Sequence, residues 1–417
     1  MKHRFGYIQV KSQFVPTEVS FQRAIRDYTD ILDQMGGQEW SVGKLANPQP
    51  LFYLMTTGGT EQALLDLRLK RKELVADEPV LVLAHPAYNS LPASLEVLAR
   101  LHQDHEGGRI FYLKGPHDSS GFDQIAAAIH DINVSHALKQ TRIGLIGTPS
   151  DWLVASSPDL EDIQKTWGTR VVKVSMDELK EFIGKVSSDA IPPLREPLLN
   201  AARAVIEPSK RDIDEAVKVY LALKESVRKH KLQALTLRCF DLVMGLQTTG
   251  CYGLAQLTDE GVIAGCEGDL VSTVAMLWVQ LLLNKTPWMA NPAKLDEVNN
   301  TLWLAHCTIP RGLVKDYGLR SHFESGIGVG IQGTLANEPV TLIRIGGKRM
   351  EKLWLAEGDI IQSGKSEDLC RTQAEIRLST GHVSDLLNAP LGNHLTMVQG
   401  HHLKRLHDWW TAMIVGR

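Results

Sequence analysis

ALTLRCFDLVMGLQTTGCYGLAQLTDEGVIAGCEGDLVSTVAMLWVQLLLN, residues 234–284, is the stretch that decides the fold. It contains two short apolar runs, ALTL and VIAGC, which are typical of strands buried on both faces. The apolar run 270–284 follows directly and predicts the helix of a βα unit. Asp241 then closes one strand, and Glu267 and Asp269 close the next. Because ligands bind at this edge of open α/β sheets, we expect the functional site here.

Glu267 and Asp269 are two residues apart, so their side chains share a face while the chain stays extended. Carboxylates gathered in this way repel one another unless a cation or a shared proton relieves them. The pair therefore predicts a metal site or a perturbed pKa. The alternative is that Asp269 only caps the helix that begins at Leu270, since Asp is a preferred N-cap residue, and that Glu267 is solvated.

The composition is that of a globular protein of several domains. The chain has 417 residues, which predicts two to four domains. Lys and Arg total 45 against 48 Asp and Glu, a net charge of -3, so nothing favours nucleic acid or an anionic membrane as a partner. Mean hydropathy is -0.12, and no apolar run is long enough to span a bilayer. The first residues show no apolar core of a signal peptide.

The five cysteines form no CxxC pair, which argues against a disulfide framework and for a reducing cytoplasm. We expect these cysteines to pack as small apolar groups, with Cys239 and Cys266 each inside a buried strand.

Strands and helices alternate from the N-terminus to about residue 290, which predicts two α/β domains with mainly parallel sheets. The polar segment 135–141 marks the boundary between them, so the domains are residues 1–140 and 141–290. The second domain opens with RIGLIGTPSDW (142–152), which resembles a phosphate-binding loop but lacks the full G-x-G-x-x-G spacing. We interpret it as a tight turn at a sheet edge.

The pattern changes after residue 290. Strand-like runs follow one another with only short polar or glycine turns between them, at residues 301–309, 326–335, 339–347, 352–362 and 370–378. This spacing leaves no room for helices and predicts an antiparallel sheet or small barrel over residues 291–417, closed by an amphipathic helix. The predicted fold class is therefore α/β, with two doubly wound domains followed by a C-terminal antiparallel β-barrel.

Several histidines and one carboxylate could complete a site at the sheet edge. His394 follows a Gly-Asn turn directly before an apolar strand, where it could reach the carboxylates of the second domain. Two carboxylates, one histidine and open water positions suit Mn²⁺ or Mg²⁺ better than zinc. Each histidine taken alone is more often structural or solvated. Others considered are His306, His322, and His401, His402 and His407, the last three fitting a solvated helix face.

Glu324 and Arg344 stand in apolar surroundings. Charged side chains are rarely buried unpaired, so Arg344 either faces solvent or pairs with a carboxylate such as Glu324. Glu324 either lines the pocket or supports a residue that does.

The segments RCFDL, AGCEGDLVSTVAMLWVQLLLNKTPW, LAHC and GNHLTMVQGHH together resemble the L-fucose isomerase and D-arabinose isomerase family and its shorter relatives. The resemblance covers the last two-thirds of the chain. It implies two α/β domains, a C-terminal β-barrel and Mn²⁺ held by a Glu, an Asp and a His. The His maps to His394 in the Asn393-His394 pair, and the Asp maps to Asp269. Asp241 stands where the family has Glu, so Asp241 or Glu267 takes the third position.

The resemblance implies aldose–ketose isomerisation of a free sugar of the L-fucose or D-arabinose type through a cis-enediol. Asp241 and Asp269 would then be the acid/base pair, and Asn393, His306 and Glu324 would bind the sugar. It also implies a homo-oligomer, with Trp152 and the segment 85–89 as further pocket walls. Two alternatives stay open: a sugar-binding or regulatory protein without turnover, and a metal-dependent enzyme acting on a modified, anionic sugar.

Overall fold

The computed structural model describes residues 4–12, 19–75 and 78–415. The chain divides into two compact units, Met1–His136 with Asp408–Arg417, and Ala137–His407. Each unit is described by itself, as unit 1 and unit 2.

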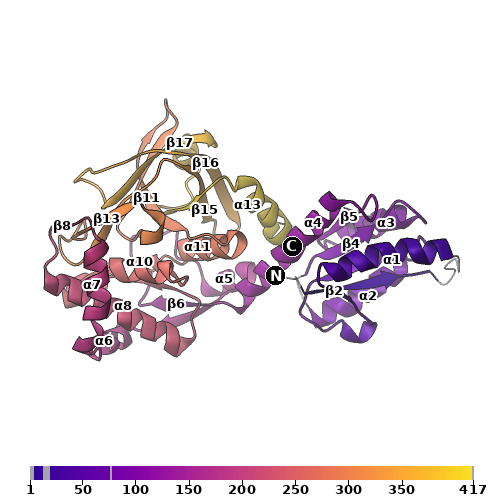
Figure 1. The fold of residues 1–417 in the computed structure, drawn as a ribbon, viewed down its shortest axis with the longest axis horizontal. Coiled ribbons are helices and arrows are strands. Elements are labelled where there is room, and N and C mark those ends of the chain that lie inside the picture. Colours follow the sequence, from indigo (N-terminus) through magenta and orange to yellow (C-terminus); the bar gives the residue numbers. More distant parts are fainter. Residues whose placement is uncertain (1–3, 13–18, 76–77, 416–417) are drawn as a thin grey trace. The chain divides into compact units, whose positions relative to one another are not determined.

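Unit 1 contains a five-stranded parallel sheet in the order β2-β1-β3-β4-β5 (Figure 1). Strands β3 and β4 are buried at every residue, as expected of apolar strands with helices on both faces. The strands are β1 (Phe5–Val10), β2 (Gly37–Glu39), β3 (Leu51–Met55), β4 (Val80–Ala84) and β5 (Gly108–Tyr112). The helices are α1 (Val19–Gln34), α2 (Glu61–Leu74), α3 (Ser90–Gln103) and α4 (Ser119–Gln140).

Unit 2 begins with a second parallel sheet, in the order β10-β9-β6-β7. Its strands are β6 (Arg142–Ile146), β7 (Arg170–Val174), β9 (Ala234–Leu237) and β10 (Ile263–Cys266). The helices of this part are α5 (Leu160–Trp167), α6 (Met176–Gly184), α7 (Pro192–Ala201), α8 (Lys210–His230), α9 (Phe240–Leu246), α10 (Cys251–Asp259) and α11 (Leu270–Leu283). Helix α8 begins with a capping box between Ser209 and Asp212, which satisfies two backbone N–H groups at its start.

The rest of unit 2 is mainly antiparallel, with one parallel pair of strands. Six strands close into a barrel in the order β11-β12-β17-β16-β15-β18. These are β11 (Trp288–Asp296), β12 (Thr301–His306), β15 (Pro339–Gly346), β16 (Lys352–Ser363), β17 (Thr372–Thr380) and β18 (Leu395–Gln399). A separate small sheet joins β14 (Gly330–Thr334), β13 (Asp316–Arg320) and β8 (Ala204–Val205), the exception being the parallel pairing of β8 with β13. The short helix α12 (Ser384–Asn388) and the helix α13 (Leu403–Trp410) complete the chain.

The predicted fold class is confirmed: parallel α/β sheets precede a closed antiparallel barrel. The run at 326–335 is the exception within the barrel region, because it pairs with β13 rather than with a barrel strand. Of the described helices, none has the length and apolar character that crossing a membrane would require.

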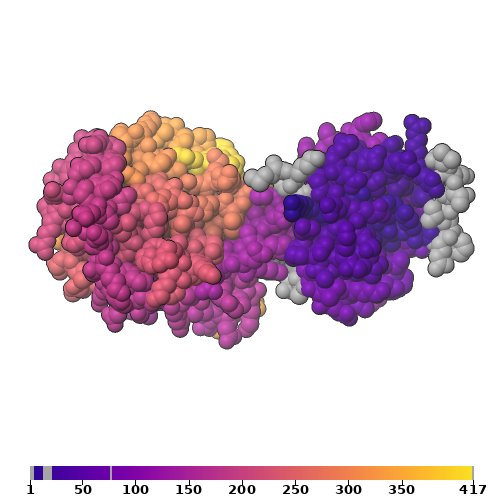
Figure 2. Space-filling model, turned by 60° about the horizontal axis from the view of Figure 1, so that its bottom comes forward, coloured from indigo at the N-terminus to yellow at the C-terminus, as the bar shows by residue number. Residues whose placement is uncertain are grey.

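Helix α11 explains why the second sheet and the barrel form one compact unit. It is apolar around its whole circumference, and a helix of that kind must be buried on all sides. It packs against β9 and β10 and also against barrel strands β15 and β18. The space-filling view shows the first half of unit 2, in magenta, and the barrel region, in orange and yellow, adjoining on the surface of this unit (Figure 2). The sequence instead places a domain boundary near residue 290, within this continuous core.

Candidate metal centre

The turn between β10 and α11 differs from the extended chain that the Glu-x-Asp spacing predicts. Glu267 has φ 62° and Gly268 has φ 75°, so both residues are in the left-handed region. The two carboxylates therefore do not share a face. Glu267 turns toward a cavity, where its Oε2 accepts a 2.6 Å hydrogen bond from the indole Nε1 of Trp152, while Asp269 turns into the protein.

Asp269 is the N-cap of α11, as the alternative interpretation predicts, and it is also fully buried. Its carboxylate accepts hydrogen bonds from the backbone N–H of Ser272 at 2.8 Å and from His394 Nδ1 at 2.9 Å. Arg344 Nη1 lies 3.8 Å from the same carboxylate. Burial raises the pKa of Asp269, but the bond from His394 and the charge of Arg344 outweigh it and hold this pKa at about 2. Asp269 is thus a structural anion.

His394 is oriented by Asp269. In the neutral ring, a proton on Nδ1 that is donated to Asp269 leaves the lone pair on Nε2, which is the tautomer in which a histidine binds a metal. Nε2 is buried and has no hydrogen-bond partner among the described residues. It lies 3.8 Å from Glu267 Oε1. A buried, unpartnered nitrogen that faces a carboxylate fits a cation bound between the two groups.

His306 completes the group from the end of β12. Its Nδ1 bonds the hydroxyl of Thr308 at 2.8 Å, and its ring centroid lies 5.6 Å from that of His394. Burial lowers the pKa of His306 well below its ordinary value, and the neighbouring His394 and His322 act in the same direction. The ring is therefore neutral at pH 7 and able to bind a cation.

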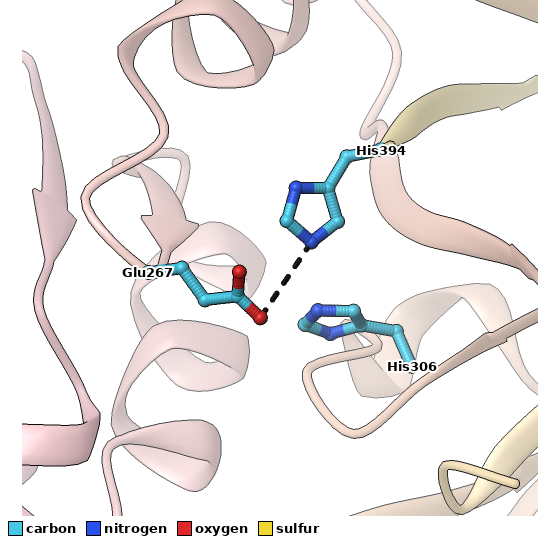
Figure 3. Close-up of side chains that lie close together, drawn as sticks. All are labelled: Glu267, His306 and His394. Atoms are coloured by element: carbon cyan, nitrogen blue, oxygen red, sulfur yellow. Dashed lines mark ion pairs between the residues drawn. The ribbon is translucent and has the colours of Figure 1, made fainter. Parts of the chain in front are cut away.

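The side chains of Glu267, His306 and His394 point toward one another (Figure 3), and one ligand atom from each lies within 4.8 Å of the others. Two imidazoles and one carboxylate make a mixed nitrogen and oxygen set that suits a divalent transition metal with open positions.

Glu267 and His306 line a cavity of ≈ 30 Å³ whose wall also includes His322, Glu324 and Asn291. Burial raises the pKa of Glu324, and the charge of Glu267 adds to that rise. Burial lowers the pKa of His322 to about 4. Glu324 thus holds a proton more readily than a solvated glutamate.

Comparison with known proteins gives a weak but consistent similarity. The chain is 23% identical over 220 residues to sulfoquinovose isomerase of Priestia megaterium, which covers 49% of the chain and 46% of that enzyme. It is 25% identical over 202 residues to sulfoquinovose isomerase of Clostridium sp. strain MSTE9, covering 48% of the chain and 45% of that enzyme. The chain thus matches somewhat less than half the length of these curated relatives. No family model matches the chain.

Among solved structures, a conserved protein of unknown function from a locus in Enterococcus faecalis aligns over 94% of both chains at 12% identity. The TM-score is 0.15, so this alignment says nothing about the fold.

The structure does not bring every predicted residue to this centre. Asp241 lies in the first turn of α9, after β9 has ended at Leu237, and its Oδ1 forms a 3.0 Å ion pair with Arg238. It does not belong to the group of Glu267, His306 and His394. Asn393 is exposed, although the histidine beside it is buried.

Two residues that the sequence analysis names have other partners in the structure than it suggests. Arg344 pairs with Asp269 rather than with Glu324, and also donates to the carbonyl of His394 at 3.0 Å. Trp152 lies in unit 2 and hydrogen-bonds Glu267 of its own chain, so it needs no neighbouring subunit. The available signals were a lone arginine inside an apolar strand and an aromatic residue directly after the first strand of the second domain.

The segment 85–89 lies in unit 1 and serves a different cavity. Tyr88 and Asn89 line a space of ≈ 1040 Å³ with residues that follow β1 and β3. Neither residue belongs to the wall of the cavity in unit 2.

Proposed function

We propose that this protein is a metal-dependent aldose–ketose isomerase that binds Mn²⁺ through Glu267, His306 and His394. The observation that carries the proposal is the buried Nε2 of His394, which has no partner among the described residues and faces Glu267 and His306. The similarity to sulfoquinovose isomerases supports the same class of reaction. When bound, the ion supplies a positive charge that stabilises the enediolate formed when the sugar loses its C2 proton.

Residues of the chain would carry out the proton transfer and position the candidate metal ligands. Glu324, whose pKa is raised, removes the C2 proton and returns it at C1, as a base whose pKa is closer to neutrality than that of a solvated carboxylate. Trp152 fixes the orientation of Glu267, and Asp269 fixes the tautomer of His394. Asp269 is therefore a positioning residue in this proposal, and Glu324 replaces Asp241 and Asp269 as the proton carrier.

For the substrate, we favour an aldose that carries an anionic group over free L-fucose or D-arabinose. Sulfoquinovose, named in the curated relatives, is an aldose with a sulfonate group. Among the described residues that line the cavity there is no lysine or arginine, so the anionic group would lie outside the cavity wall.

The experiment combines a substrate panel with a metal measurement. Aldoses with a sulfonate, phosphate or carboxylate at the last carbon and their neutral counterparts are incubated with Mn²⁺ in D₂O, and ketose formation and deuterium uptake at C1 of the ketose are followed. We expect turnover of an anionic aldose, loss of Mn²⁺ binding in His394→Gln, and unchanged binding in the control His401→Gln, whose histidine is exposed. Full activity of His394→Gln, or after exhaustive chelation, would exclude the proposal. Saturable sugar binding without metal or turnover would instead indicate a sugar-binding protein.

A further inference from the structure

All five cysteines of the chain line the cavity that contains Glu267 and His306. They come from five separate segments: Cys239 precedes α9, Cys251 begins α10, Cys266 ends β10, Cys307 follows β12 and Cys370 precedes β17. All are free thiols. The sequence predicts that they pack as small apolar groups, and four of the five are buried. Cys239, however, is not inside a strand as predicted, because β9 ends at Leu237 and Cys239 is the N-cap of α9. Because all five converge on one small cavity, the thiols are part of this site.

Two of the thiols are already in contact. The Sγ atoms of Cys239 and Cys266 lie 3.3 Å apart, because Cys266 ends β10 and Cys239 follows the end of the adjacent parallel strand β9 at the same sheet edge. A disulfide has an S–S length of about 2.05 Å, so bond formation requires an approach of about 1.2 Å. Cys266 is followed by the left-handed residues Glu267 and Gly268, and Cys239 lies between a strand and a helix. Turns at both positions can take up this movement.

Both cysteines are linked to the carboxylate of Glu267. Cys266 is its neighbour in the chain. Cys239 precedes Phe240, whose ring packs edge-on against Trp152 at 5.0 Å between centroids, and Trp152 donates the 2.6 Å hydrogen bond to Glu267. A shortening of the sulfur contact therefore acts on Glu267 from two sides.

We propose that Cys239 and Cys266 are a reversible oxidation site for peroxide, and that their disulfide displaces Glu267 and weakens metal binding. The effect of the disulfide on metal binding rests on the proposed function, whereas the oxidation of the two cysteines does not. Disulfides in cytosolic proteins, where they occur, are commonly of this transient, redox-sensing kind.

The chemistry balances with peroxide as the only oxidant. One thiol attacks the O–O bond, takes one oxygen as a sulfenic acid and releases the other as water. The second thiol then attacks the sulfenic sulfur, the S–S bond forms, and the hydroxyl leaves with the thiol proton as a second water. Two thiols are oxidised and one peroxide is reduced to two waters. A small-molecule thiol reverses the step by exchange.

The first test detects the bond itself in the full chain without metal. Reduced protein is treated with hydrogen peroxide, and the remaining thiols are alkylated in denaturant. Trypsin alone is unsuitable because no Lys or Arg lies between Arg238 and Lys285. Cleavage after Asp241, Asp259 and Glu260 separates Cys239, Cys251 and Cys266 onto different peptides.

We expect the number of free thiols to fall from the five of the sequence to three, with one cross-link between the peptide ending at Asp241 and the peptide 261–267. The matched control Cys370→Ser lines the same cavity and should form the same cross-link, whereas Cys239→Ser should form none. Retention of all five thiols overturns the proposal. A cross-link between Cys307 and Cys370, which also share a hydrogen bond, in place of the expected one overturns it equally.

The second test measures Mn²⁺ binding by calorimetry before and after peroxide, with each variant compared with its own untreated form. We expect oxidised wild-type protein to lose about 10-fold or more in affinity, as for changes next to metal ligands, and to regain it with reductant. Oxidised Cys239→Ser should keep its affinity. If the cross-link forms and the affinity for Mn²⁺ is unchanged, the proposed effect of the disulfide on metal binding is wrong. If the reduced protein binds no Mn²⁺, the proposed function fails, and the mass measurement still decides the oxidation site.

Discussion

At the scale of single residues, the buried pair of Asp269 and Arg344 offers a sharp prediction. Both side chains are almost fully buried, so removing the charge of one leaves the other uncompensated. We expect Asp269→Asn to lower the free energy of unfolding by about 3–5 kcal/mol, measured by urea denaturation. The control is Asp241→Asn, which breaks a partly exposed ion pair and should cost under about 1 kcal/mol.

A double-mutant cycle with Arg344→Met identifies the cause of that loss. If the uncompensated charge is responsible, the double variant should lose less than the sum of the single variants, by about 0.5–3 kcal/mol. Additive losses would show that the two side chains are not coupled.

The pH dependence of the same variant follows from the low pKa of Asp269. Its value of about 2 lies below the ordinary 3.8, so the stabilisation is complete above pH 3.8 and is lost as the pH falls through 2. The difference in free energy of unfolding between wild type and Asp269→Asn should therefore shrink as the pH is lowered from 4 to 2. A difference that stays constant over this range would contradict the assignment of Asp269 as a charged group in the folded protein.

The individual residues also show which parts of the candidate site could be predicted from the sequence. The sequence singled out Glu267 and Asp269 as acidic residues after a buried strand and His394 as a histidine before a strand, which are local patterns. His306 and Glu324 entered as sugar-binding residues, a role that the family resemblance implies. The sequence could not separate the carboxylate that faces the cavity from the one that holds His394. That distinction depends on the left-handed backbone of Glu267 and Gly268, and a Glu at such a position leaves no local signal.

At the scale of elements, the turn from β10 to α11 carries a prediction with a matched control. Gly268 has φ 75°, and a Cβ there would lie 2.6 Å from the backbone oxygen of Thr148. Gly261 has φ 86°, but a Cβ there would meet only Gln280 Nε2, at 4.0 Å. We expect Gly261→Ala to cost about 1–2 kcal/mol from backbone strain alone. Gly268→Ala should cost more, and it should also weaken Mn²⁺ binding because Glu267 is displaced.

Urea denaturation and calorimetry with Mn²⁺ measure the two effects separately. Equal stability losses in both variants, with equal Mn²⁺ affinity, would mean that the turn has no special role in placing Glu267.

The element order itself was predictable, since apolar runs of strand and helix length alternate up to α11 and only strand runs follow. The pairing of the strands was less predictable, because it depends on contacts between distant segments. Strand β14, in the glycine-rich run, pairs with β13, which in turn pairs with β8. The local pattern of β14 is the same as that of a barrel strand.

At the scale of the whole molecule, the sequence separates three domains where the structure forms two compact units. The reason is α11, whose apolar surface packs against both the second sheet and the barrel. Sequence periodicity shows that such a helix is buried, but not which elements bury it. The three candidate ligands, which lie at the ends of β10, β12 and β18, consequently all belong to unit 2.

That location predicts where metal binding stabilises the molecule. A cation that binds only the folded form at 100 times its dissociation constant stabilises by about 2.7 kcal/mol. With all three candidate ligands in Ala137–His407, added Mn²⁺ should slow hydrogen exchange around Cys266–Leu270, at the end of β12 and at the start of β18. Exchange in Met1–His136 should stay as it is without metal, and His394→Gln should show no slowing in either unit. Slowing confined to the first unit would place the cation elsewhere, because binding energy appears first in the elements that supply the ligands.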